Sequence, residues 1–220
     1  MTDIKANLEE VQSKLLPGVQ LIAVTKTHSP AEINVAIDNG VTDIGENKVQ
    51  EILEKYDSVK PVRWHMIGHL QTNKVKYIID KVCLIHSVDS LKLAKEIDKR
   101  ARAAEKTMDI LIQVNPAHEE SKFGLDPGDV AALINDILEQ CPNVRICGLM
   151  CIAPYTDDPQ DVRPYFAEVR KMYEKFGSID NENIDFKYLS MGMSHDFEAA
   201  QQEGSNMVRV GTAIFGARVY

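Results

Sequence analysis

The stretch VCLIHSVDSLKLAKEIDKRARAA, from Val82 to Ala104, contains one complete strand-and-helix unit. Its first six residues, Val82–Ser87, form a short run rich in apolar side chains, which is typical of a buried strand. Ser90 stands where a helix N-cap is expected, because its hydroxyl can accept a backbone N–H. From Ser90 to Ala104 the apolar residues share one face and Lys and Glu lie opposite, which predicts an amphipathic helix.

The same unit recurs along the chain on both sides of this stretch. The predicted strands are Leu21–Val24, Thr42–Ile44, Arg63–Ile67, Val82–Ser87, Asp109–Val114, Ile146–Cys151, Phe186–Ser190 and Met207–Val210. The predicted helices between them are Pro30–Asn39, Lys48–Tyr56, Thr72–Ile79, Ser90–Ala104, Pro127–Gln140, Pro159–Phe176 and Phe197–Glu203. A further amphipathic helix, at about Asp3–Leu15, precedes the first strand.

This alternation predicts the fold class. Strands that are separated by helices pair in parallel through right-handed crossovers. About eight such units in 220 residues favour a compact (β/α)8 barrel, a TIM barrel with an extra N-terminal helix, in a single domain spanning residues 1–220. An open doubly wound sheet is the alternative. In a barrel the chemistry lies at the carboxyl ends of the strands, so polar residues at those ends are the candidate site.

Composition limits the classes of partner. The formal charge of −8 and the sequence pI near 5.3 argue against nucleic acid or an anionic membrane as the main partner. The sequence has no apolar run of transmembrane length and no signal peptide, so a cytoplasmic location is expected. Cys147 and Cys151 lie four residues apart in a strand-like run, and buried reduced thiols are favoured over a zinc site.

Lys26 is the first candidate site residue. It ends the otherwise apolar run Leu21-Ile-Ala-Val-Thr-Lys26. A lysine held over a barrel mouth is partly desolvated, which lowers its pKa and frees the neutral amine as a nucleophile. The alternative is a lysine that extends from a strand end into solvent. The other end of the chain decides between these two interpretations.

The run Asn206-Met-Val-Arg-Val-Gly-Thr-Ala-Ile-Phe-Gly216 supplies a second cation. Arg209 alternates with Met207 and Gly211, so the three residues share one face of the last strand. If that face is the barrel interior, the guanidinium needs a partner, either a ligand or a structural carboxylate. Gly211 permits close backbone approach and Thr212 adds a hydroxyl. Loops after the last two strands of such barrels often bind phosphate.

The loop Ser190-Met-Gly-Met-Ser-His-Asp196 precedes that last unit. Gly192 allows a tight turn, and Ser194 stands just before the predicted helix Phe197–Glu203. A serine beside the free N–H groups at a helix start suits a phosphate, whereas the alternative role is only to cap that helix.

Other polar residues leave alternatives open. Asn47 follows the second strand, where it either caps the next helix or reaches into the pocket. His65 and His69 are four apart and are expected to share a face, but no third ligand stands at metal spacing, so no metal site is predicted. Lys122 lies in an exposed loop, where solvation is favoured over anion binding.

A ligand with an aldehyde and a phosphate would unite Lys26 with the C-terminal run. With these residues the chain resembles the pyridoxal phosphate (PLP) homeostasis proteins, the YggS/PROSC family. The resemblance extends from about Leu21 to Gly216. Its motifs are Ala23-Val-Thr-Lys26, Gly45-Glu-Asn-Lys-Val-Gln-Glu51, Trp64-His-Met-Ile-Gly-His-Leu-Gln-Thr-Asn-Lys74, Ser121-Lys-Phe-Gly124, Gly148-Leu-Met150, Leu189-Ser-Met-Gly-Met-Ser-His-Asp196 and Val208-Arg-Val-Gly-Thr-Ala-Ile-Phe-Gly216.

The resemblance implies a role for each candidate residue. It implies a barrel like the N-terminal domain of bacterial alanine racemase, with Lys26 as the Schiff-base lysine and Arg209 facing the pyridine nitrogen. Asn47 matches the pocket asparagine of the family. The phosphate is implied to bind to Ser194, Gly211 and Thr212. No departure from the family pattern at a motif position is of a kind that would threaten cofactor binding.

Arg209 also bears on activity. PLP acts best as an electron sink when a carboxylate keeps its pyridine nitrogen protonated, and a permanently charged arginine cannot accept that proton. Racemases compensate with a second base, which in alanine racemase is a tyrosine from a second, β-rich domain. This sequence ends at Tyr220, soon after the last strand, so that domain is expected to be absent.

Three functions therefore compete. The favoured one is a PLP-binding homeostasis protein that buffers PLP or passes it to apo PLP-dependent enzymes, without robust turnover of its own and as a monomer. An amino-acid racemase needs a second base, which the sequence does not reveal. A phosphosugar enzyme on the same barrel accounts for the phosphate elements but not for Lys26.

Overall fold

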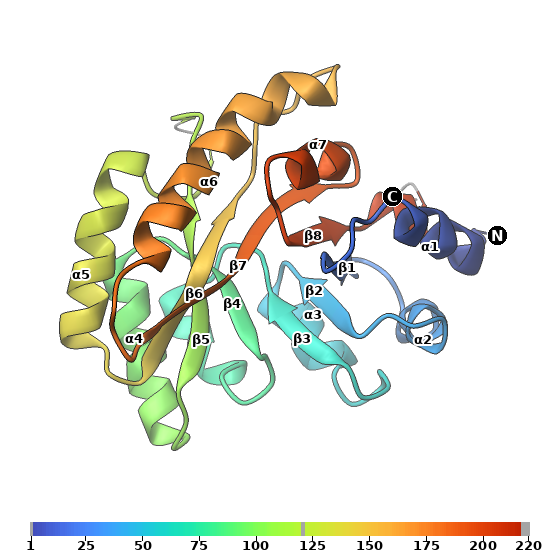
Figure 1. Ribbon diagram of the computed structural model, residues 1–220. Coiled ribbons are helices and arrows are strands. Elements are labelled where there is room, and N and C mark those ends of the chain that lie inside the picture. The colour runs from blue at the N-terminus through green and yellow to red at the C-terminus, as the bar shows by residue number, and fades with distance from the viewer. Residues whose placement is uncertain (1, 120–121, 217–220) are drawn as a thin grey trace.

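Eight parallel strands form a closed barrel in the computed structural model, which describes residues 2–119 and 122–216 (Figure 1). Each strand pairs with the next along the chain, and β1 closes the sheet by pairing with β8. The strands are β1 Gln20–Val24, β2 Asp43–Glu46, β3 Arg63–Met66, β4 Leu84–Val88, β5 Met108–Val114, β6 Val144–Cys151, β7 Ile184–Met193 and β8 Met207–Val210. The barrel prediction is confirmed, and the β1–β8 pairing excludes the open sheet.

Helices lie on the outside of the barrel; the first precedes the first strand, the last follows the last strand, and the others connect successive strands. They are α1 Ile4–Ser13, α2 Pro30–Asp38, α3 Val49–Lys55, η1 Thr72–Tyr77, α4 Leu91–Ala103, η2 Pro127–Asp129, α5 Val130–Gln140, η3 Pro159–Val162, α6 Arg163–Gly177, α7 Phe197–Gln202 and α8 Thr212–Phe215. The predicted helix at residues 72–79 is a 3₁₀ helix, and the two predicted helices that start at Pro127 and Pro159 each begin with a 3₁₀ turn. The short helix α8 was not predicted.

Local sequence signals set several helix ends. Ser29 and Glu32 form a capping box at the start of α2, and Pro30 occupies its first turn. Gly40 follows the C-cap of this helix with a φ of 98°, as expected for a helix stop. The Ser90 hydroxyl accepts the N–H of Leu93 and caps α4, as predicted.

The strand β7 is longer than predicted. It was expected at Phe186–Ser190 but extends to Met193, and it therefore includes Gly192. Gly192 has a φ of 88°, and a Cβ there would lie 2.7 Å from the Cβ of Ala200 in α7. The glycine thus lets the strand continue against the following helix where a side chain would clash.

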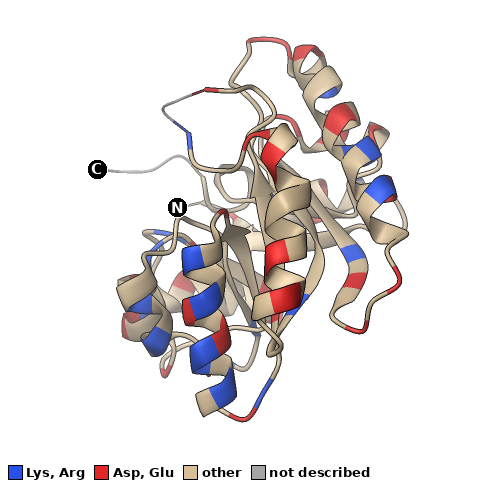
Figure 2. Cartoon of the chain, turned by 90° about the vertical axis from the view of Figure 1, so that its left-hand side faces the viewer, with Lys and Arg blue, Asp and Glu red and all other residues tan. Residues whose placement is uncertain are grey.

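The sheet separates two hydrophobic clusters, one inside the barrel and one between the strands and the helices. Neighbouring residues of β8 belong to different ones: Met207 lies in the cluster inside the barrel and Val208 in the larger cluster between strands and helices. Arg209 therefore faces the interior with Met207, as alternation along a strand requires. Charged side chains are intermixed in sign on the helices around the barrel, as Figure 2 shows. The inner cluster contains Ile22, Leu84, Leu111, Cys147, Met150 and Met207.

The helix α1 is additional to the eight strand-and-helix units, and it confirms the expected N-terminal helix. It packs against α2 and α8, beside the last described residues of the chain (Figure 1). Within residues 2–119 and 122–216, none of the helices combines the length and apolar character needed to cross a membrane.

Candidate functional site

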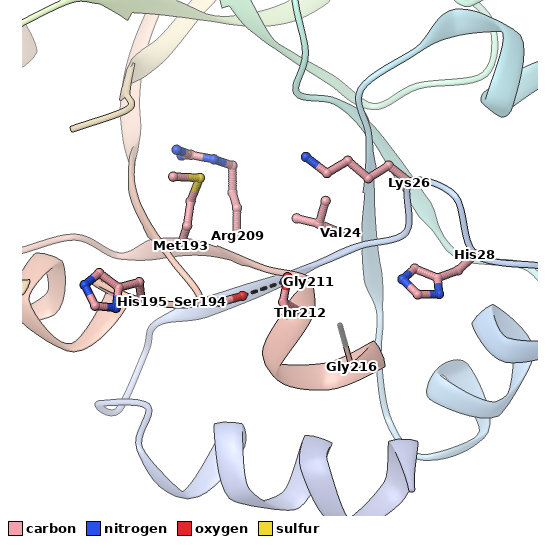
Figure 3. Close-up of a pocket in the computed structure, with 10 residues that line it drawn as sticks. All are labelled: Val24, Lys26, His28, Met193, Ser194, His195, Arg209, Gly211, Thr212 and Gly216. Carbon is pink, nitrogen blue, oxygen red and sulfur yellow. Dashed lines mark hydrogen bonds between the residues drawn. The ribbon is translucent and has the colours of Figure 1, made fainter. Parts of the chain in front are cut away.

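A pocket of about 230 Å³ opens at the carboxyl end of the barrel, where β1 and β8 meet (Figure 3). Its lining residues come from the ends of β1 and β7 and the segments that follow them, from β8, and from α8 with its flanking glycines. Five of the six predicted site residues line it, namely Lys26, Ser194, Arg209, Gly211 and Thr212. The closed barrel thus brings together two cations that are far apart in the sequence.

Lys26 extends from the end of β1 into this pocket, toward the side on which Arg209 lies (Figure 3). The peptide groups on both sides of it are held by polar side chains. The Thr25 carbonyl accepts a hydrogen bond of 2.9 Å from Lys55 Nζ, and the Thr27 N–H donates one of 2.6 Å to Glu51 Oε2. Thr27 itself has a φ of 68°, which is a genuine outlier for a β-branched residue. The backbone at Lys26 is therefore fixed and locally strained.

A buried group of ionic side chains holds this backbone. Lys55 Nζ lies 2.7 Å from Glu46 Oε1 and 2.7 Å from Glu51 Oε2. Glu46 is fully buried on β2 and also accepts a hydrogen bond from the Thr25 hydroxyl at 2.7 Å. Burial raises the pKa of Glu46, and the hydrogen bond from Lys55 only partly opposes this. Lys55 therefore compensates two carboxylates while it positions the segment that carries Lys26.

Arg209 is buried in the barrel, and only 4% of its surface is exposed. Its Nη1 donates to the carbonyl and the hydroxyl of Ser190, at 2.8 and 2.6 Å, and its Nη2 donates to the Cys151 carbonyl at 2.8 Å. These acceptors hold the guanidinium, and among the described residues no carboxylate forms an ion pair with it. Burial lowers its pKa, but a guanidinium remains protonated in proteins. The site thus contains a fixed positive charge.

Ser194 lies at the other end of the pocket, beside Gly211 and Thr212 (Figure 3). Its Oγ accepts hydrogen bonds from the N–H groups of Gly211, at 3.2 Å, and Ala213, at 3.4 Å. Ser194 therefore caps α8 rather than α7, the helix to which the sequence assigned it. Its own O–H remains to donate to a ligand, together with the hydroxyl of Thr212.

Asn47, the sixth predicted residue, does not line this pocket. It follows β2 directly and lines a neighbouring pocket of about 200 Å³ with Lys48, His69 and Lys74.

The expectation that His65 and His69 share a face is wrong. His65 is buried inside the barrel and contacts His86, whereas His69 is exposed and stacks on Phe123 with ring centroids 3.9 Å apart.

No group of three or more potential metal ligands occurs within the described ranges 2–119 and 122–216. Cys147 and Cys151 are buried free thiols, as predicted. Lys122 is partly buried, and its Nζ donates to Glu119 Oε1 at 2.9 Å and to the Ala153 carbonyl at 3.2 Å. The lysine is thus held by protein groups rather than solvated. Ser121 and Tyr220 lie outside the described residues.

Sequence reasoning missed half of the pocket lining. The remaining lining residues are Val24, His28, Met193, His195 and Gly216. They lie within two residues of predicted ones, or at the end of the last motif, so a window around each predicted residue would have found most of them. The imidazole of His28 is fixed by stacking on Phe215, with ring centroids 4.6 Å apart.

Comparison with known proteins places this chain in a family. The protein-family model of the alanine racemase N-terminal domain matches residues 1–219. The chain is 47% identical to the pyridoxal phosphate homeostasis protein of Aquifex aeolicus, over 91% of this chain and 88% of that protein. It is 40% identical to that of Helicobacter pylori, over 90% of this chain and 87% of the relative.

A solved structure agrees with these sequence relatives. PipY of Synechococcus elongatus PCC7942, solved with PLP bound, superposes with a TM-score of 0.88 at 35% identity, over 97% of this chain and all (100%) of that one. The resemblance that the sequence motifs indicated is therefore confirmed. The chain belongs to the alanine racemase N-terminal domain family and, within it, to the pyridoxal phosphate homeostasis proteins.

Proposed function

We propose that this protein binds pyridoxal 5′-phosphate in the pocket between β1 and β8 and serves in PLP homeostasis. The observation that carries the proposal is the joint position of Lys26 and Arg209 in one small pocket that is also lined by the hydroxyl residues Ser194 and Thr212. The names of the relatives support the homeostasis role, and the PLP bound to PipY supports the ligand.

The residues of the pocket fit the three parts of this cofactor. Lys26 supplies the amine that holds the aldehyde carbon as a Schiff base. Arg209 points its unused N–H groups at the ring nitrogen. The phosphate is held by Ser194, Gly211 and Thr212. We place Asn47 beside the cofactor from the second pocket, which it lines directly after β2.

The character of Arg209 favours holding over turnover. PLP supplies an electron sink for carbanions, and this sink is strongest when the ring nitrogen is protonated. A guanidinium has only donors, so it stabilises the unprotonated nitrogen. The protein therefore keeps the cofactor in a weakly activated form. Release follows when an amine of an acceptor protein displaces Lys26 from the aldehyde carbon.

We further propose that apo PLP-dependent enzymes receive the cofactor, that the protein acts in the cytoplasm and that it is a monomer. The buried free thiols suit a reducing compartment. Sedimentation velocity of the loaded protein tests the monomer, and transfer of PLP to an apo-aminotransferase, followed by its regained activity, tests the delivery.

Reduction with borohydride tests the central assignment. We expect purified protein to absorb in the imine band, to lose that band on reduction and to yield a pyridoxyl adduct on the peptide with Lys26. Lys26→Ala should lose both signals, whereas Lys95→Ala, an exposed lysine on α4, should keep them. An adduct on another lysine, or an unchanged spectrum in Lys26→Ala, would contradict the assignment.

A second measurement separates a holder from a racemase. Amino acids incubated with the loaded protein in deuterium oxide should keep their Cα proton. Incorporation of solvent deuterium at enzyme-like rates would establish catalysis and overturn the holder interpretation.

A further inference from the structure

A line of buried polar side chains crosses the interior of the barrel and ends at Arg209. It consists of Asp43 on β2, His65 on β3, His86 on β4 and Ser190 on β7, which we call the relay. All four residues are at least 98% buried, because their exposed fractions are 0, 2, 0 and 0%. Polar groups in a barrel interior are costly unless each is satisfied by a hydrogen bond.

The distances make the relay continuous. His65 Nε2 lies 2.8 Å from Asp43 Oδ1, and His65 Nδ1 lies 3.0 Å from His86 Nε2. His86 Nδ1 lies 3.2 Å from Ser190 Oγ, which accepts the hydrogen bond of 2.6 Å from Arg209 Nη1. Each ring nitrogen of the two histidines therefore faces one partner in the relay.

The chemistry of the two ends determines where each hydrogen lies. Arg209 can only donate, so Ser190 Oγ accepts there and its own O–H is left to donate to His86 Nδ1. Asp43 as a carboxylate can only accept, so His65 Nε2 must carry a hydrogen. Between these ends, His86 Nε2 donates to His65 Nδ1. Every donor then points away from Arg209 and toward Asp43.

The opposite order fails at one contact. If His86 carried its hydrogen on Nδ1, its Nε2 would accept from His65 Nδ1. A neutral His65 would then have a bare Nε2 only 2.8 Å from the Asp43 carboxylate, so two acceptors would face each other. A buried pair of acceptors at that distance is strongly unfavourable, which leaves a single arrangement for neutral rings.

The groups around the relay keep its ends in these states. Burial acts to raise the pKa of Asp43, but hydrogen bonds from His65, Arg63 and Thr42 lower it to about 2. Arg63 pairs with Asp43 through Nε at 2.7 Å and Nη2 at 2.8 Å. Gln20 Nε2 also donates to Asp43, at 2.8 Å.

The remaining neighbours do not compete for the same hydrogens. The Cys83 thiol lies 3.5 Å from His65 Nε2 but donates its single hydrogen to the Trp64 carbonyl. Burial lowers the pKa of His65, with only partial opposition from Asp43, and lowers that of His86 well below its usual value. Both rings are therefore neutral, as the arrangement above requires.

We propose that the relay is a positioning device that fixes the Ser190 hydroxyl and through it the Arg209 guanidinium that faces the ring nitrogen of the cofactor. This inference rests on the proposed function. With Ser190 and Cys151 accepting three of its hydrogen bonds, Arg209 presents its remaining N–H groups in one orientation. Asp43, at the opposite mouth of the barrel, anchors that orientation.

The protein without cofactor tests the direction of the relay. Long-range 15N–1H NMR of the histidine rings should show His86 and His65 each protonated on Nε2 and bare on Nδ1. In Asp43→Asn the amide can donate or accept, so both rings should change tautomer or populate two. The matched control is Asp109→Asn, whose carboxylate pairs with Arg145 at the same mouth but outside the relay. A wild-type His86 protonated on Nδ1 would overturn the proposal.

The loaded protein tests the link to the cofactor. Ser190→Ala should weaken PLP binding by roughly tenfold, since it removes a hydrogen bond to a charged group. Ser190→Ala should also shift the NMR resonance of the 15N-labelled ring nitrogen of bound PLP. Ser190→Thr, which keeps a hydroxyl, should restore both the PLP affinity and this resonance. Asp43→Asn should shift the same resonance in the same direction.

The outcomes are separable. A wild-type protein that binds no PLP removes the proposed function, and the role of the relay toward the cofactor with it. A wild-type protein that binds PLP while Ser190→Ala and Asp43→Asn keep its affinity and its ring-nitrogen resonance overturns the relay alone. A lower melting temperature without either change would mark these residues as structural only.

Discussion

At the scale of single residues, Thr27 is the position where the fold imposes a cost beside the site. Its left-handed φ of 68° immediately follows Lys26, and its N–H is held by Glu51. Backbone strain of this kind persists only where the surroundings determine it strongly, and here Glu51, which holds the Thr27 N–H, is itself paired with the buried Lys55. Strain and ionic contacts together fix the direction in which Lys26 leaves β1.

We expect Thr27→Gly to raise the free energy of unfolding by about 0.5 kcal/mol. Relief of the left-handed conformation contributes about 1–2 kcal/mol, and the extra freedom of glycine in the unfolded chain cancels much of it. Urea denaturation measures the change. The control Thr27→Ala keeps a Cβ in the left-handed region and should gain less. Marked destabilisation by glycine would show that the conformation is not strained.

At the scale of elements, Lys55 on α3 joins three pieces of the barrel. It contacts Glu46 of β2, Glu51 of its own helix and the segment after β1. A buried cation between two carboxylates is weak evidence for net stability, but removing it leaves an uncompensated buried charge. The contact also holds the carbonyl of Thr25, directly before Lys26, so under the proposed function we expect stability and cofactor binding to be coupled here.

Lys55→Met should therefore lower the free energy of unfolding by about 3–5 kcal/mol at pH 8. The loss should shrink at pH 5, because the pKa of Glu46 is already raised by burial and the carboxyl can take up a proton once the cation is gone. Urea denaturation at the two pH values measures both effects.

The exposed pair Lys60–Asp38 provides the control for Lys55. Its side chains are 50 and 56% exposed, so Lys60→Met should change stability by less than about 1 kcal/mol at either pH. Equal losses in the two variants would contradict the buried-charge argument.

At the scale of the whole molecule, the sequence predicted the barrel because each strand-and-helix unit carries its own local signal. Closure of the sheet into a barrel was predicted from the number of these units, about eight in 220 residues. The relay was not predicted, since His65 and His86 are 21 residues apart and His86 and Ser190 are 104 apart, and only barrel register brings them together. In the sequence of its strand alone, His86 is only a polar residue in an apolar run, and nothing there indicates its partners.

The site shows the same division between local and tertiary information. Lys26 and Arg209 were found because each ends or interrupts an apolar strand. The role of Ser194 was assigned to the wrong helix, since α8 has too few residues to show periodicity and its cap is made across the barrel. The motif assigned Asn47 to the cofactor, and its position directly after β2 puts it in the lining of a second pocket.

Two neutral histidines in the barrel interior should make the whole molecule sensitive to acid. Burial lowers the pKa of His65 and of His86 below their usual value of 6.5. Below pH 6.5 the unfolded chain takes up protons that the folded protein does not. Because the unfolded state then binds more protons than the folded state, stability rises with pH. The free energy of unfolding should therefore fall as the pH drops from 7 to about 5, by up to about 1.4 kcal/mol per pH unit for each ring.

Asp43 acts in a separate and lower window. Its pKa of about 2 in the folded protein lies below its ordinary value of 3.8, so its contribution is present above about pH 4 and is lost as the pH falls toward 2. The change of the unfolding free energy with pH between pH 6.5 and 5 thus reports the histidines alone among the relay residues.

His86→Gln should reduce this pH dependence by the contribution of one titrating ring, as measured by urea denaturation at several pH values. The control is His118→Gln, because the His118 side chain is 61% exposed. A slope reduced equally in both variants would assign the acid sensitivity to something other than burial in the barrel.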